Sequence, residues 1–131
     1  MPKVLVIDDD VQVRQMLTHV LEEAGYGVKV ASDGGEGVRI YRKSPVDVVI
    51  LDVIMPDKEG VETLQELKSF DPGLKTIAIS GGGRNRPGDY LNVMRALGAQ
   101  EIFEKPVSKE KLLEAVRSLY RRSLWETHGT S

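Results

Sequence analysis

The sequence predicts an α/β fold, a doubly wound, five-stranded parallel sheet with helices on both faces. Short apolar runs alternate five times with longer segments in which apolar residues recur three and four positions apart, the period of a helix packed on one side. The apolar runs are continuous, as is typical of strands that are buried on both faces. Strands that alternate with helices in this way pair in parallel through right-handed crossovers.

Each predicted element is bounded by local signals in the sequence. The strands are expected at residues 4–7, 28–31, 46–51, 74–79 and 101–104, and the helices at residues 11–24, 34–42, 58–69, 90–97 and 109–121. Asp10 is placed to cap the first helix and Ser108 the last. Gly25 and Gly98 follow the first and fourth helices, where glycine commonly ends a helix.

The length and composition fit a single domain. At 131 residues and 40% hydrophobic content, the chain is long enough to bury a core without cross-links. We assign residues 1–122 to this domain and residues 123–131, which are polar apart from Leu124 and Trp125, to a flexible C-terminal tail. The absence of cysteine excludes disulfides, thiolate metal sites and cysteine nucleophiles, and two histidines are too few for an imidazole metal cluster.

Charge and hydropathy narrow the expected partners. The net charge is −2 and no long basic run is present, so we expect no direct binding to nucleic acid. The apolar run near the N-terminus is too short for a signal peptide or a membrane span, so we expect no membrane association. A cytoplasmic protein is the prediction, and the lack of cysteine agrees with a reducing compartment.

Polar residues gather where the predicted strands end. The first strand runs into Asp8 and Asp9, the third into Asp52, the fourth into Ser80 and the fifth into Lys105. Ligands of open parallel sheets bind beyond the carboxyl ends of the strands, so these side chains are expected at one edge. A carboxylate after so apolar a strand as residues 46–51 must reach solvent or a partner, because burying it alone is costly.

The expected set of side chains suits phosphoryl chemistry. Three converging carboxylates repel one another unless a cation lies among them, and an all-oxygen site suits Mg²⁺. A carboxylate in such a site can attack an activated phosphorus, while Lys105 and Ser80 hold the transferred oxygens. Each residue also has a purely structural interpretation: the acids can cap a helix, Ser80 can lie in a turn and Lys105 can be a surface amine. Their occurrence at four successive strand ends favours a functional site.

Five motifs resemble the receiver domains of two-component response regulators. They are VLVIDDD at the first strand end, ASDGGEGV at residues 31–38, LDVIMPDKEG at residues 51–60, IAISG at residues 77–81 and EKP at residues 104–106. Order and spacing both agree, and the resemblance covers residues 3–122. It implies a flavodoxin-like strand order, 2-1-3-4-5.

The resemblance also implies a role for each site residue. Asp52 is expected to be the phosphoacceptor, and Mg²⁺ is expected to be held by Asp9, by Asp8 largely through water, by Asp52 and by the backbone carbonyl of Ile54. Ser80 becomes the switch hydroxyl and Lys105 the counter-charge of the phosphoryl group, followed by a cis peptide to Pro106. The implied partners are a sensor histidine kinase or phosphotransfer protein and a downstream protein target. The domain is a signalling module rather than an enzyme in the usual sense, although it catalyses its own phosphorylation and dephosphorylation.

Two features depart from the pattern that the resemblance implies. The family commonly has a tyrosine or phenylalanine three residues before the lysine, where this chain has Ile102. Phe103 is adjacent, but neighbouring residues of a strand face opposite sides, so it is not expected to replace that ring. The loop at residues 81–89 is rich in glycine, and Arg84 and Arg86 within it are placed to attract an anionic donor.

Two other classes of function remain open at this level. A phosphatase of the haloacid dehalogenase type would use Asp8 as nucleophile and Asp10 as acid, but it favours Thr or Val where this chain has Gln12, and it needs a late acidic pair. After Lys105 the only acids are Glu110, Glu114 and Glu126. An interaction module that keeps the fold without the chemistry is the third class. No output domain is recognised in the chain, and whether it is a complete regulator or part of a longer protein stays open.

Overall fold

Five strands alternate with five helices along the chain. The computed structural model describes residues 2–53, 59–80 and 87–129. The elements, in chain order, are β1 (Lys3–Ile7), α1 (Val11–Glu23), β2 (Gly27–Ala31), α2 (Gly34–Lys43), β3 (Val48–Asp52), α3 (Glu59–Phe70), β4 (Lys75–Ser80), α4 (Pro87–Ala96), β5 (Glu101–Glu104) and α5 (Lys109–Gly129).

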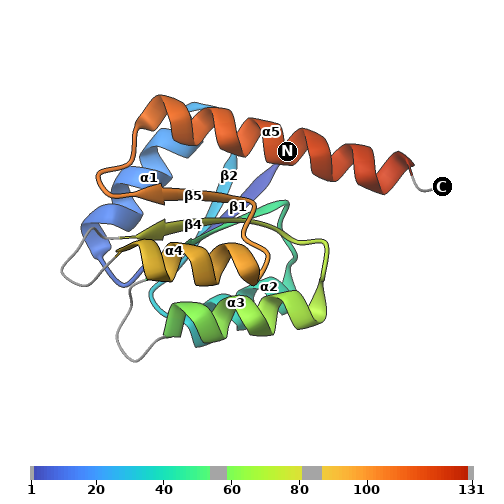
Figure 1. Cartoon of the computed structure of the whole chain (residues 1–131). Coiled ribbons are helices and arrows are strands. Elements are labelled where there is room, and N and C mark those ends of the chain that lie inside the picture. The colour runs from blue at the N-terminus through green and yellow to red at the C-terminus, as the bar shows by residue number, and fades with distance from the viewer. Residues whose placement is uncertain (1, 54–58, 81–86, 130–131) are drawn as a thin grey trace.

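The strands form one parallel sheet in the order β2-β1-β3-β4-β5. The predicted strand order is therefore confirmed. The order reverses between β1 and β3, and at such a point the loops after the two strands diverge and leave a crevice at the carboxyl edge. Helices α1 and α5 lie on one side of the sheet, and α2, α3 and α4 lie on the other (Figure 1).

Each face of the sheet has its own hydrophobic core. Along β1, Val4 and Val6 point towards α1 and α5, whereas Leu5 and Ile7 point towards α2 and α3. The same alternation holds along β3, whose five residues are all buried. A strand covered on both sides needs apolar residues at every position, which explains the continuous apolar runs in the sequence.

The predicted caps of the helices are confirmed. The Asp10 carboxylate accepts hydrogen bonds from the backbone N–H groups of Gln12 and Val13 at the start of α1. Gly25 and Gly98, which follow α1 and α4, have φ angles of 97° and 106°, a left-handed conformation that favours glycine. The Ser108 hydroxyl accepts a bond from the backbone N–H of Lys111 in the first turn of α5.

Two predicted helix bounds need correction. Helix α4 begins at Pro87, three residues before the predicted start at residue 90, and proline is well suited to the first position of a helix. Helix α5 ends at Gly129 rather than at residue 121. Residues 123–129, which the sequence assigned to the tail, are therefore helical. A helix that is already formed extends at little cost, and the polar residues of this segment do not prevent it.

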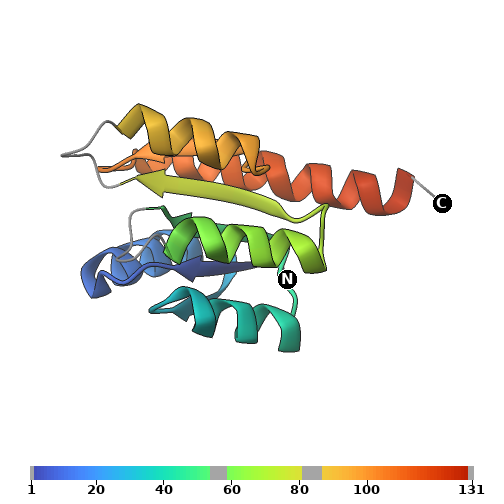
Figure 2. The same cartoon turned by 60° about the horizontal axis from the view of Figure 1, so that its bottom comes forward.

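The C-terminal part of α5 extends past the ends of the strands in both views (Figure 2). The helical conformation of residues 123–129 does not test the predicted flexibility of residues 123–131, which stays a prediction. Across the described part of the chain, every helix is too short or too polar to cross a lipid bilayer.

Candidate phosphoacceptor site

The strand-end residues of the sequence prediction meet at the carboxyl edge of the sheet. Asp8 directly follows β1, Asp52 is the last residue of β3, and Ser80 is the last residue of β4. All three are buried, with at most 3% of their surface exposed. Lys105 directly follows β5 and reaches back across the edge to two of them. The sheet thus brings together groups that are up to 97 positions apart in the chain.

The turn between β1 and α1 is fixed by its own acidic residues. The backbone N–H of Asp8 donates to the carbonyl oxygen of Ala31, over a distance of 3.1 Å, which continues the pairing of β1 with β2. Oδ1 of Asp8 accepts from the backbone N–H of Asp10 at 2.8 Å. Asp10 in turn caps α1, so it serves the helix and does not belong to the acidic cluster.

Lys105 is the positive charge of the site. Its Nζ lies 3.0 Å from Oδ2 of Asp8 and 3.4 Å from Oδ2 of Asp52. Burial by itself would lower the pKa of Lys105, but the two carboxylates outweigh burial and raise it above 10.5. The ammonium therefore stays charged at neutral pH. Its contribution to stability is fully present below pH 10.5 and is lost only as the pH rises through the higher pKa of the folded state.

Ser80 is held next to Lys105 by the backbone. The N–H of Lys105 donates to the carbonyl oxygen of Ser80 at 2.7 Å. The Oγ of Ser80 is buried, and among the described residues it has no hydrogen-bond partner. A buried hydroxyl without a partner is costly, and the Ser80 Oγ can still accept and donate a hydrogen bond.

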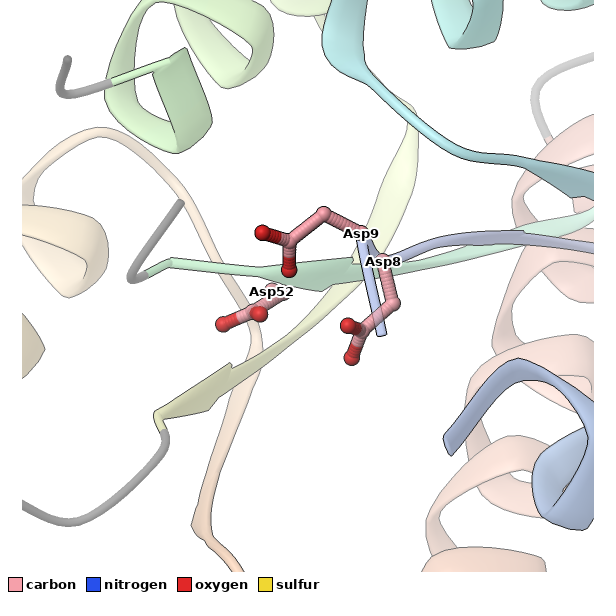
Figure 3. Close-up of side chains that lie close together, drawn as sticks. All are labelled: Asp8, Asp9 and Asp52. Carbon is pink, nitrogen blue, oxygen red and sulfur yellow. The ribbon is translucent and has the colours of Figure 1, made fainter. Parts of the chain in front are cut away.

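Asp8, Asp9 and Asp52 form a compact acidic cluster. One carboxylate oxygen of each lies within 4.8 Å of the others, and Figure 3 shows Asp8 and Asp9 at the end of β1 beside Asp52 at the end of β3. Oδ2 of Asp8 is buried, and its partner among the described residues is the Lys105 ammonium. Three carboxylate oxygens that lie this close together fit a hard cation such as Mg²⁺.

Some predicted features lie outside the described residues. They are Ile54, whose backbone carbonyl was expected to bind the metal, and residues 81–86 of the glycine-rich loop, including Arg84 and Arg86. The cis peptide between Lys105 and Pro106 is present.

Ile102, at the position where the family commonly has an aromatic residue, faces a defined side of the sheet. Ile102 packs against the core on the side of α4, whereas Phe103 packs against the core on the side of α5. The prediction that Phe103 does not replace that ring is confirmed, because the two side chains lie on opposite faces of the sheet. Ala78, which lies next to Ile102 on β4, has a small aliphatic side chain.

Two residues that sequence reasoning did not single out also shape the site. The guanidinium of Arg14 donates from Nη1 to the backbone carbonyl oxygen of Asp8 at 2.7 Å. Gly60, in the first turn of α3, lies against the backbone at the end of β3. The available signals were an arginine one helical turn after the capping Asp10 and a glycine near the start of a helix. Neither signal is specific without the contacts.

Replacing Gly60 by alanine is expected to destabilise the domain. A Cβ atom at this position would lie 2.6 Å from the carbonyl oxygens of Asp52 and Val53, and neither backbone oxygen can rotate away. We expect Gly60→Ala to lower the free energy of unfolding by about 1–3 kcal/mol, the usual cost of overpacking, as measured by urea denaturation.

Gly35→Ala in α2 is the matched control for this prediction. The nearest atoms to a new Cβ there are side-chain atoms at 3.4 and 3.6 Å, an ordinary contact. Alanine favours a helix by up to about 1 kcal/mol over glycine, so this variant is expected to be at least as stable as the parent. Equal unfolding midpoints for the two variants would show that α3 can move away from β3 without cost.

The fold and site together define a class of protein, a doubly wound α/β domain with an acidic cluster and a lysine at the carboxyl edge of the sheet. Residues 4–117 match the family described as response regulator receiver domain. The chain belongs to this family, and it is thus a signalling domain of the two-component type. The family match does not support the phosphatase alternative.

Similar proteins agree with this assignment. The chain is 35% identical over 117 residues to Protein CcdB of Bacillus subtilis, covering 88% of this chain and 95% of that protein. It is 34% identical over 125 residues to the transcriptional regulatory protein CpxR of Klebsiella pneumoniae, covering 95% of this chain but only 52% of CpxR. The chain therefore spans about half the length of this larger regulator.

Solved structures of receiver domains superpose closely on the chain. A response regulator receiver domain from Clostridium thermocellum matches with a TM-score of 0.81 and 35% identity, covering 93% of this chain and 96% of that one. A CheY-like receiver domain protein from Methanospirillum hungatei matches with a TM-score of 0.87 and 27% identity, covering 96% and 98%.

Proposed function

We propose that Asp52 accepts a phosphoryl group from a sensor histidine kinase or a phosphotransfer protein, with Mg²⁺ as cofactor. The single observation that supports this most is the convergence of Asp52, the Asp8 and Asp9 carboxylates and the Lys105 ammonium at one edge of the sheet. A negative nucleophile can approach a negative phosphoryl group only where positive charge offsets the repulsion.

Each residue has a defined part in the transfer. A carboxylate oxygen of Asp52 forms a bond to phosphorus as the bond from phosphorus to the donor nitrogen breaks, which leaves an acyl phosphate on the aspartate. Asp8, Asp9 and Asp52, together with the carbonyl of Ile54, are proposed to hold Mg²⁺. When bound, the metal neutralises charge on the phosphoryl oxygens and orients them. Lys105 keeps its charge at neutral pH and pairs with one of these oxygens.

Ser80 is proposed to convert phosphorylation into a structural change. Its hydroxyl is buried beside Asp52 with no bond among the described residues, so a phosphoryl oxygen would give it an acceptor. No aromatic ring is present at position 102 to follow its movement. We therefore propose that the signal leaves the site mainly through the segment at residues 81–97, which includes α4, rather than through β5.

The remaining proposals concern the surroundings of the domain. Its output is a contact with a downstream protein, without direct binding of nucleic acid by this chain or association with a membrane. The compartment is the cytoplasm, where the proposed kinase domain and Mg²⁺ are both available. The domain also catalyses the hydrolysis of its own acyl phosphate.

Beryllofluoride, a mimic of the phosphoryl group, tests this function without a kinase. With Mg²⁺ it is expected to increase the protection of backbone amides from hydrogen exchange at residues 87–97, and to a smaller degree at residues 101–104. A new anion at Asp52 gives Ser80 and the following segment something to bind, and ordering of a segment is a common form of switch. Exchange is measured by mass spectrometry with and without the ligand.

Asp52→Ala is the control, and its exchange is expected not to respond to beryllofluoride. A parent protein that does not respond either would support the interaction module without phosphoryl chemistry. If the largest increase in protection is instead at residues 101–104, β5 carries the signal and the proposed route through α4 is wrong.

A further inference from the structure

We propose that Arg14 is a positioning residue for the metal site, which orients the Asp9 carboxylate by holding the peptide group that precedes it. This proposal rests on the proposed function, because it assigns Asp9 to Mg²⁺. It concerns a side chain that lies on α1, outside the acidic cluster, and that has no direct role in the transfer.

The contacts of Arg14 lead back into the turn that carries the acids. Its backbone N–H donates to the carbonyl oxygen of Asp10 at 3.0 Å, as expected in the first turn of α1. Its partly buried guanidinium donates to the carbonyl oxygen of Asp8 at 2.7 Å. One residue therefore bonds to the carbonyl on each side of Asp9. A hydrogen bond from a charged donor is among the stronger kinds, so this contact restrains the peptide more than a neutral donor would.

Of the three acidic residues in the cluster, Asp9 is the one that its surroundings restrain least. The Asp8 carboxylate is buried and bonded to the N–H of Asp10, and Asp52 lies within a strand. Asp9 is exposed and lies between β1 and α1. Because a peptide unit is planar, fixing the Asp8 carbonyl also fixes the N–H of Asp9. The next peptide, between Asp9 and Asp10, is held by the bond from the Asp10 N–H to Oδ1 of Asp8. With both planes held, the backbone dihedrals of Asp9 are set, and with them the direction in which its side chain leaves the backbone.

The positive charge of Arg14 would weaken Mg²⁺ binding, whereas its proposed positioning role would strengthen it. A guanidinium near the acidic cluster repels Mg²⁺, so its removal would tighten binding if charge were its only influence. Loss of a group that orients a metal ligand typically weakens binding by 10- to 100-fold. The two explanations therefore predict changes of opposite sign, and a single titration separates them.

Arg14→Met tests the proposal, because it removes the donor and the charge and keeps most of the aliphatic stem. We expect its dissociation constant for Mg²⁺, measured by isothermal titration calorimetry on the whole chain, to rise about tenfold. Arg14→Lys retains a charged donor and is expected to recover most of this loss. Arg117→Met, at an exposed position on α5, is the matched control for loss of a positive charge and is expected to leave the constant unchanged.

The metal-free protein provides a second measurement. The Asp8 carbonyl and the Asp9 N–H belong to one peptide group, so loss of the bond from Arg14 is expected to shift the ¹⁵N resonance of Asp9. The shift should appear in Arg14→Met and be small in Arg117→Met. The same spectra show whether each variant is folded.

Three results would overturn the proposal: unchanged or tighter Mg²⁺ binding by folded Arg14→Met, no recovery in Arg14→Lys, or an unshifted Asp9 resonance. Failure of the proposed function has a different signature. In that case the parent protein and Asp9→Ala bind Mg²⁺ equally, whatever the Arg14 variants do.

Discussion

Asp52→Ala is expected to abolish phosphorylation of the chain. With Mg²⁺ and either acetyl phosphate or a phosphohistidine kinase domain, the parent protein should gain one acid-labile phosphoryl group, and the variant none. Asp52 is the proposed nucleophile, a buried carboxylate at the end of β3 that lies 3.4 Å from the Lys105 ammonium. Asp8 lies 3.0 Å from the same ammonium, but its other oxygen is bonded to the backbone N–H of Asp10. Intact-mass spectrometry measures the gain directly.

Two controls make this result specific. Chelation of Mg²⁺ should prevent the gain in the parent protein, since the three carboxylates would then repel the incoming phosphoryl group. Glu114→Ala, which removes an exposed acid on α5, should be phosphorylated like the parent. An acid-labile phosphoryl group on Asp52→Ala under the same conditions would show that the phosphoacceptor is another residue.

Asp9→Ala is expected to weaken Mg²⁺ binding, whereas Lys105→Ala is not. Asp9→Ala removes a proposed ligand, so its dissociation constant for Mg²⁺ should rise at least about tenfold. Lys105→Ala removes a positive charge that pairs with Asp8 and Asp52, so its Mg²⁺ binding should be equal to that of the parent or tighter. It should still accept some phosphoryl group but lose the protection of α4, because the ammonium no longer fixes the phosphoryl oxygens.

The stability of the metal-free protein gives an independent check of Asp9. Like charges within 4.8 Å of one another, as in the acidic cluster, repel by about 1 kcal/mol even in a water-like dielectric. Asp9→Ala is therefore expected to raise the free energy of unfolding by about that amount when no metal is present, and to lose the further stabilisation that Mg²⁺ gives the parent. Indistinguishable Mg²⁺ titrations of Asp9→Ala and Lys105→Ala would contradict the separate roles of these residues.

Local patterns in the sequence were enough for the elements of the fold and for most of the site. The continuous apolar runs at β1 and β3 and the spaced apolar residues of the helices depend only on which faces are buried, and burial follows a fixed period along the chain. The caps at Asp10, Gly25 and Ser108 are equally local. Because parallel strands place their carboxyl ends at one edge, Asp8, Asp52, Ser80 and Lys105 could be assigned to one site before any distance was known.

The ends of α4 and α5 show where such patterns are insufficient. The apolar period that predicts the last helix ends at residue 121, yet α5 continues to Gly129. A helix that is already formed adds further residues at little cost, whether or not they contact a core. The sequence period therefore underestimates the length of α5.

The sequence by itself determined the class of fold, the strand-end residues and the opposite facing of Ile102 and Phe103, since each depends on periodicity and order along one chain. Only the tertiary structure decided which contacts support the acidic cluster. The bond from Arg14 to the Asp8 carbonyl and the approach of Gly60 to β3 depend on how α1 and α3 settle against the sheet. Contacts to backbone atoms of this kind place no constraint on the identity of the accepting residue, so they leave no pairwise pattern in the sequence.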